Sequence, residues 1–344
     1  MYNEKKVTKW KRNESDMALS KNLTISQIAE KANVSIATAS RVINQSGTVK
    51  PETRERVLRA MKDLNYQRKG GPGDSKFILT SFPDFDNPFN AEIIRGIQAA
   101  TRRRGYRLFL QQMEDFRSPD SYRFLLNQQV FGGVIFAHLI PDKALLDSLC
   151  LQHPVVMCSE HSDTDAVPFV AIDDFTAAYD AMDYLISIGK RRIAMLNSSM
   201  DYSYAIHRER GYRAALQDAG LPVEEQWIAH LPGIDAEFAY STAVSILSSS
   251  ERPDAFFCVS DMFASAVIKA ARSLNLSIPQ DVAILGFDNI YLTTMTVPSI
   301  TTVSQPTYQI GYQSANLLMD LMEGNPILNR RVILDTELIV RGST

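Results

Sequence analysis

The sequence predicts two folds in one chain: a small all-α three-helix helix-turn-helix head, then a larger α/β domain of two lobes with parallel sheets. Its 344 residues suit one small and one large module. Apolar residues follow a helical spacing over residues 24–66, whereas short apolar strands alternate with amphipathic helices from Phe77 onward. The formal charge is +8 over residues 1–69 and −11 over the remainder. A basic head on an acidic body is typical of a polyanion-binding module joined to a domain that DNA repels.

Composition divides the chain into four segments. Residues 1–22 are polar, charged and aperiodic, which predicts a disordered extension. Residues 23–66 form the predicted head. Residues 67–76, QRKGGPGDSK, hold three glycines and a proline and predict a flexible linker. These glycines lack the Gly-Lys-Ser/Thr ending of a phosphate loop, so no phosphate loop is predicted there. Residues 77–344 form the predicted large domain.

The head is predicted to contain three short helices. Thr24 and Gln27 have the spacing of a capping box at the start of the first helix. Ser35 is the predicted cap of a second helix, from Ile36 to Ile43, and Pro51 begins a third. The apolar stripe predicted for the third helix consists of Val57, Leu58, Met61 and Leu64.

Two sets of alternating strands and helices predict the two lobes. Strands joined by helices form parallel sheets, and ligands bind beyond the carboxyl ends of such strands. The predicted ligand-binding loops follow Phe82, Ala137, Ser159, Asn197, Ser260 and Phe287.

Several classes of protein are disfavoured. No apolar run approaches the roughly 18 residues of a membrane span, and the first twenty residues lack the apolar centre of a signal peptide. We therefore expect a cytoplasmic protein with no membrane partner. Cys150, Cys158 and Cys258 match no metal-binding spacing and are predicted to be buried thiols. No catalytic motif is present, so we expect neither an enzyme nor a cofactor.

The second helix carries the candidate DNA-reading surface. Its predicted outer face consists of Ile36, Ala37, Ser40 and Arg41. Small and cationic side chains on a basic module favour DNA over the alternative, a three-helix bundle that binds protein.

The stretch ISQIAEKANVSIATASRVINQSGTVKPETRERVLRAMKDLNY closely resembles the DNA-binding head of the LacI/GalR repressors. The resemblance continues through NPFNAEIIRGIQAATRRRGYRL, RERGYRAAL, VAILGFDNI and PSITTVSQPTYQIG, and covers nearly everything from Leu23 to Thr344. It implies a periplasmic-binding-protein-like sensor. The implied N-lobe comprises about residues 77–172 and 304–331, and the C-lobe about 173–303 and 332–344.

The resemblance also assigns roles in the head. It implies that the helix from Ser35 lies in the major groove, with Ile36 and Ala37 at its exposed start. Arg41 matches the base-reading arginine and suits bidentate contact with guanine. Positions that match phosphate-facing residues are Thr24, Ser35, Thr38, Ser40, Asn44, Thr53 and Arg54. For each hydroxyl among them, helix capping is an equally good interpretation.

One segment departs from the family pattern. Family members usually carry a hinge helix whose leucine enters the minor groove, but no such apolar wedge lies between Tyr66 and Phe77 here. Three glycines in residues 67–76 also disfavour a helix. This departure argues against minor-groove insertion and keeps open a second role, docking onto another DNA-bound transcription factor.

For the sensor, the resemblance implies that Arg208 and Asp288 bind a small effector. Further candidates, next to strand ends, are Ser260, Asp261, Asp84, Phe85, Ser159 and Glu160. An arginine near a helix start is often merely solvated, and an aspartate after a strand often caps a helix, as we expect for Asp173 and Asp174. The usual stacking aromatic is replaced by His230-Leu-Pro-Gly-Ile. Phe238 or Tyr240 is a possible substitute.

The sequence thus predicts a homodimeric DNA-binding repressor whose operator affinity changes with a polyhydroxylated effector, a nucleoside such as cytidine or a sugar. The implied dimer contacts are the helix after Phe89 and the segment 276–278. The alternatives are a co-regulator that docks onto another DNA-bound factor and a sugar-binding protein without a DNA role.

Overall fold

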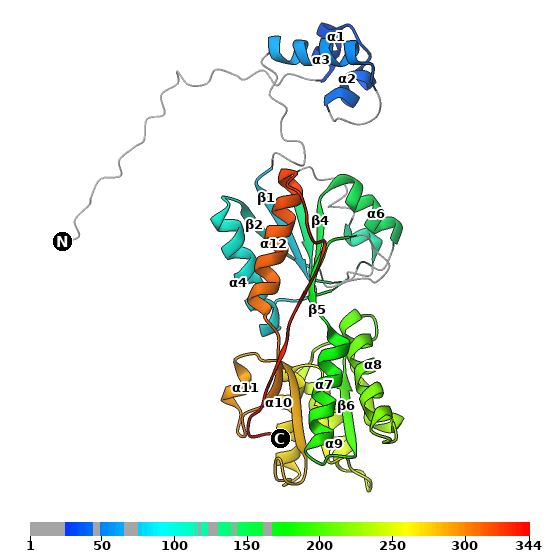
Figure 1. The fold of residues 1–344 in the computed structure, drawn as a ribbon, viewed down its shortest axis with the longest axis vertical. Coiled ribbons are helices and arrows are strands. Elements are labelled where there is room, and N and C mark those ends of the chain that lie inside the picture. Colours follow the sequence, from blue (N-terminus) through cyan, green and yellow to red (C-terminus); the bar gives the residue numbers. More distant parts are fainter. Residues whose placement is uncertain are drawn as a thin grey trace, which may run out of the picture. The chain divides into compact units, whose positions relative to one another are not determined.

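The computed structural model describes residues 25–43, 49–64, 75–113, 115, 118–122, 130–138, 140, 143–160 and 167–344. It divides into two compact units, residues 1–71 and 72–344 (Figure 1). The predicted extension 1–22, most of the linker 67–76, and the candidates Thr24 and Asn44 lie outside the described residues. Among the described residues, no helix is long and apolar enough to cross a membrane.

The head consists of α1 (Ile25–Ala32), α2 (Ile36–Ile43) and α3 (Pro51–Asp63), as the sequence predicts. The Ser35 hydroxyl accepts a hydrogen bond from the Thr38 amide at 3.1 Å, which confirms its capping role. The prediction that Leu58 is buried is wrong, because this side chain is 50% exposed. The third helix buries residues at i, i+3, i+4 and i+7, and these are Val57, Ala60, Met61 and Leu64.

The N-lobe is built on a sheet in the order β11-β5-β4-β3-β1-β2, with every described pair parallel. Its strands are β1 (Phe77–Phe82), β2 (Arg107–Gln112), β3 (Gly133–Phe136), β4 (Val155–Cys158), β5 (Phe169–Ile172) and β11 (Arg331–Leu334). Its helices are α4 (Pro88–Arg103), α6 (Lys143–Gln152) and α12 (Thr307–Glu323), with a short 3-10 turn at Pro119–Tyr122.

The C-lobe sheet has the order β12-β10-β9-β8-β6-β7, in which only the β10–β12 pair is antiparallel. Its strands are β6 (Ile193–Asn197), β7 (Ile228–His230), β8 (Ala255–Cys258), β9 (Ala283–Asp288), β10 (Thr301–Ser304) and β12 (Glu337–Ile339). Its helices are α7 (Asp174–Ser187), α8 (Ser203–Asp218), α9 (Ala236–Leu247), α10 (Asp261–Ser273) and α11 (Leu292–Met295), with a 3-10 turn at Glu225–Trp227.

The chain crosses between the lobes three times, after β5, after β10 and after β11 (Figure 1). The second crossing follows Ser304, which pairs with Asp288 and so belongs to the C-lobe, not to the implied N-lobe segment 304–331. The last comes later than residue 332, because residues 331–334 pair in parallel with β5 and so belong to the N-lobe.

Alternation along the N-lobe strands separates two apolar layers. Ile78, Ile135 and Val156 pack into the layer that contains α4, whereas their neighbours Leu79 and Val134 pack into the layer that contains α6. Cys158 and Cys258 are buried as predicted, but Cys150 on α6 is exposed, so that part of the prediction is wrong.

Helices α4 and α12 touch through their backbones. A Cβ atom added at Gly96 would lie 2.0 Å from the Tyr308 carbonyl oxygen, and one at Gly311 would lie 2.1 Å from the Ile93 carbonyl oxygen. Only glycine permits this approach at either position, because backbone atoms cannot rotate away.

We expect Gly311→Ala to lower the free energy of unfolding by roughly 1–3 kcal/mol or more, because the two helices must separate. Thermal unfolding followed by circular dichroism measures the change. Gly233→Ala is the matched control, since nothing lies within 4 Å of its added Cβ. Equal melting temperatures for the two variants would contradict the close-packing argument.

Candidate functional site

A cavity lies between the two lobes, at the carboxyl ends of both sheets. It measures about 740 Å³ when its open mouth is included, within the range of small-molecule sites. The N-lobe contributes Pro83, Asp84, Asn87, Phe89, Asn90, Ile93, Ala137, Ser159 and Glu160. The C-lobe contributes Tyr202, Tyr204, Arg208, Gly233, Ile234, Val259, Ser260 and Asp288.

The structure brings most of the predicted effector residues together. Four of the six predicted loops contribute to the cavity wall, those after Phe82, Ser159, Asn197 and Phe287, and at the other two positions Ala137 and Ser260 lie on the wall themselves. The candidates on its wall are Asp84, Ser159, Glu160, Arg208, Ser260 and Asp288. Phe85 and Asp261 are not on the wall. Phe85 is 39% exposed and its ring lies 6.2 Å from that of Phe82.

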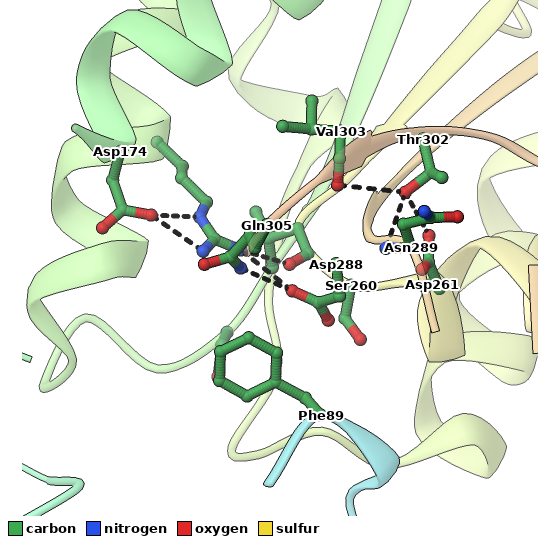
Figure 2. Close-up of polar contacts among 12 residues, drawn as sticks. Phe89, Asp174, Ser260, Asp261, Asp288, Asn289, Thr302, Val303 and Gln305 are labelled. Atoms are coloured by element: carbon green, nitrogen blue, oxygen red, sulfur yellow. Dashed lines mark hydrogen bonds and ion pairs between the residues drawn. The ribbon is translucent and has the colours of Figure 1, made fainter. Parts of the chain in front are cut away.

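Arg208 is held rigidly at the centre of the C-lobe wall. Its Nε atom donates to Asp174 at 2.8 Å, its Nη2 atom lies 2.7 Å from the same carboxylate oxygen, and its Nη1 atom donates to the Val259 carbonyl at 2.7 Å (Figure 2). The guanidinium also lies 3.6 Å from the centre of the Phe287 ring. With only 5% of the residue exposed, this cation is presented to the cavity in one orientation.

Asp288 faces the same cation from the end of β9. Its Oδ1 atom lies 3.9 Å from Nη1 of Arg208 and accepts a hydrogen bond from the side-chain Nε2 of Gln305 at 2.8 Å (Figure 2). Its backbone has a φ of 112°, a conformation that non-glycine residues rarely adopt and that is often found at functional sites. Burial raises the pKa of Asp288, against the opposing effect of Arg208.

Asp261 has a structural role instead. It is fully buried, and its carboxylate accepts hydrogen bonds from the Thr302 hydroxyl at 2.6 Å and the Ile290 amide at 2.9 Å. These contacts hold the loop that follows Asp288, so Asp261 supports the wall from behind (Figure 2).

Glu160 is the most unusual N-lobe residue of the cavity. It is 3% exposed, and one carboxyl oxygen accepts hydrogen bonds from the Ser203 amide at 3.2 Å and from the Ser203 hydroxyl. The other oxygen, Oε1, is buried and has no hydrogen-bond partner among the described residues. Burial raises the pKa of Glu160 to about 8, although the hydrogen bond from Ser203 opposes this effect.

Sequence reasoning missed the aromatic side of the cavity. Tyr202 and Tyr204 stack at 5.2 Å between ring centres, and Figure 2 shows Phe89, from α4, alongside Ser260 and Asp288. Tyr202 and Tyr204 follow the end of β6 by a few residues, in the stretch DYSY at residues 201–204, and aromatic residues at that place are the signal that could have identified them. The expected substitutes do not line the cavity: Phe238 is 55% exposed and Tyr240 packs beside Lys269.

Three further polar residues near strand ends have defined roles. Asp173 caps α7 through a hydrogen bond from the Thr176 amide at 3.0 Å, as predicted. Asp174, expected to cap as well, instead binds Arg208. Ser260 caps α10 by accepting from the Met262 amide at 3.2 Å, so it serves helix and cavity together.

In the head, the candidate residues lie on α2 and α3. Ile36 is 57% exposed at the start of α2, Arg54 is exposed on α3, and Ser35 is exposed before α2. Thr38 and Thr53 are half-buried. Ala37, Ser40 and Arg41 lie within α2, but their side chains are outside the described part of the structure.

Comparison with known proteins decides the family. Residues 24–69 match the family model described as bacterial regulatory proteins, lacI family, and residues 182–344 match the periplasmic binding protein-like domain. The HTH-type transcriptional repressor CytR of Escherichia coli strain K12 is 33% identical over 328 residues, which cover 93% of this chain and 96% of CytR. The chain belongs to the lacI family. It is therefore a DNA-binding transcriptional regulator, as the resemblance implied.

Other lacI-family relatives agree. The stretches AEIIRGI, DDFTAAYDA, GFDNIYLT and ELIVRGST predict a likeness to the cytidine repressor, which the CytR match confirms. Catabolite control protein A of Priestia megaterium is 31% identical, with 94% of this chain and 99% of that protein covered. Among solved structures, the regulator CelR in complex with cellobiose has a TM-score of 0.71 and 29% identity, covering 94% of this chain and all of that one.

We expect Glu160→Gln to flatten the pH dependence of stability. Between the usual carboxyl pKa near 4.5 and the raised value near 8, the folded state keeps a proton that the unfolded state releases. The contribution of Glu160 to the free energy of unfolding is therefore complete below about pH 4.5. It is lost as the pH rises towards 8, by up to about 1.4 kcal/mol per pH unit.

Urea unfolding at pH 5, 6, 7 and 8 measures this dependence. The quantity compared is the difference in the free energy of unfolding between Glu160→Gln and the unaltered protein at each pH. Glu251→Gln, which changes an exposed carboxylate, is the control. The same pH slope for Glu160→Gln and the unaltered protein would contradict the assignment.

Proposed function

We propose that this protein is a homodimeric, cytoplasmic repressor, without enzymatic activity, whose affinity for a DNA operator changes when a small polyhydroxylated molecule binds between the lobes. One observation carries the proposal: a fixed cation and a buried carboxylate, Arg208 and Asp288, converge on a cavity that both lobes line. A ligand that contacts both lobes at once can change how they close on each other, and such a change is the means by which it acts on the heads.

The donor and acceptor set favours a nucleoside or a sugar. Asp288 accepts hydrogen bonds from ligand hydroxyls, and the guanidinium of Arg208 donates to ring or hydroxyl oxygens. Phe89 and Tyr204 supply aromatic surface against which a base or a sugar ring can stack. The likeness to CytR supports testing cytidine first, and the cellobiose complex of CelR supports sugars as the alternative.

The whole proposal is tested with the full chain in two steps. Binding-site selection from random duplexes identifies an operator, and titration of that operator is then repeated with cytidine, other nucleosides, pentoses and cellobiose. We expect one of these compounds to change the operator affinity. The absence of any response across the panel would count against effector control.

We expect Asp288→Asn to abolish the ligand response while DNA binding is kept. Asparagine tolerates the positive φ and preserves the shape of the side chain but removes its charge. A ligand at 100 times its dissociation constant raises the free energy of unfolding by about 2.7 kcal/mol, which the variant should lose. Thermal shift measures this, and Asp218→Asn, an exposed carboxylate far along α8, is the control.

We expect Arg41→Ala to weaken operator binding by about 1–3 kcal/mol and to remove the preference at one base pair in each half-site. Repeating the site selection with the variant measures both effects. Arg54→Ala is the matched comparison, since removing a side chain that binds phosphate weakens binding to all sequences alike. An unchanged base preference in the Arg41→Ala selection would remove this residue from base reading.

A second role, docking onto another DNA-bound factor, is supported by the linker composition. The predicted flexible linker of ten residues would span roughly 16–19 Å and would tether each head without fixing its orientation. Footprinting with and without a candidate co-regulator separates this role from independent binding.

A further inference from the structure

One end of the N-lobe carries a group of cationic side chains. Parallel strands all begin at the same edge of a sheet, so the residues that start β1 and β2 lie on the side away from the cavity. Helix α4 runs back to this edge before β2 begins. We call Lys76, Arg102, Arg103 and Arg107 the basic cluster.

The backbone confirms that these residues are neighbours. The Arg107 amide donates to the Lys76 carbonyl at 2.8 Å, and Arg102 and Arg103 end α4 shortly before β2 begins at Arg107. The same edge of the sheet continues to β11, whose first residue is Arg331 after Arg330, both exposed. Positive charge therefore lies towards both ends of this edge, and the uncharged starts of β3, β4 and β5 lie between them.

The charges of the basic cluster are available to a partner. All four side chains are exposed, and none forms an ion pair with another described residue. The carboxylates nearby, Asp320 and Glu323, both pair with Arg104, at 2.8 and 2.6 Å, and Lys76 is close enough to Glu323 to lower the pKa of that carboxylate. Lys76 lies 4.2 Å over the Tyr106 ring, and Arg103 donates to the neutral hydroxyl of Tyr312.

This end contrasts with the rest of the domain. Residues 70–344 carry a formal charge of −11, so a DNA duplex is repelled by most of their surface. Lys76 is also the last residue of the linker 67–76. The basic cluster thus includes the residue at which the predicted linker joins the acidic domain.

We propose that the basic cluster binds the phosphate backbone of duplex DNA next to the half-site that the head occupies. Because residues 67–76 lack the leucine wedge of the family, the predicted linker has no such side chain to hold the domain at the DNA. Phosphate contacts from exposed arginines and a lysine do so without reading sequence. An acidic protein would satisfy the same charges, but the tether raises the local concentration of DNA alone.

This inference rests on DNA binding by the head, and it is tested by the salt dependence of binding. The variant Lys76→Gln/Arg102→Gln/Arg107→Gln is compared with the unaltered full chain on the selected operator and on an unrelated duplex. The plot of log affinity against log salt should become less steep by about 0.9 for every phosphate that the variant no longer neutralises, on both duplexes. The ratio of the two affinities should stay unchanged.

The matched control is Arg192→Gln/Arg210→Gln/Arg252→Gln, which removes the same charge from the C-lobe. Its salt slope should equal that of the unaltered protein, and circular dichroism melts confirm that both triple variants fold. Equal slopes for the two variants would overturn the proposal and leave an acidic protein as the partner of the basic cluster. Because the unrelated duplex needs no operator, the test remains valid if the selection yields none.

Discussion

The buried guanidinium of Arg208 connects more of the sensor domain than any other side chain near the cavity. It binds Asp174 at the first crossing between lobes, the Val259 carbonyl at the end of β8, and the ring of Phe287 on β9. A cation with so little access to water is stable only when its donors are paired, so these elements must keep their places together. The cavity wall is rigid on the C-lobe side for this reason.

The N-lobe side is organised differently. Glu160 takes its hydrogen bonds from Ser203, which starts α8 in the C-lobe, so a buried carboxyl bridges the two lobes. Together with the crossing at Asp174, this contact couples the lobes at the cavity. A ligand that meets the unpaired oxygen of Glu160 and also Asp288 would therefore contact both lobes.

Formal charge is distributed unevenly along the chain. The head and the end of the N-lobe that the linker joins are basic, whereas the remainder of the sensor is acidic. The cavity at the carboxyl ends of the strands and the basic cluster at the opposite edge thus lie at the two ends of one parallel sheet.

The sequence by itself determined the helix-turn-helix, the alternation of strands and helices in two lobes, and the strand ends around the cavity, because periodicity and strand polarity are local properties. Tertiary structure decided which acid serves which role. Asp261 comes shortly after a buried strand and Asp288 ends one, yet Asp261 supports the wall from behind whereas Asp288, with a φ of 112°, faces the cavity. The partnership of Asp174 with Arg208, the burial of Ala60 in place of Leu58, and the late crossing after β11 likewise depend on packing between segments far apart in sequence.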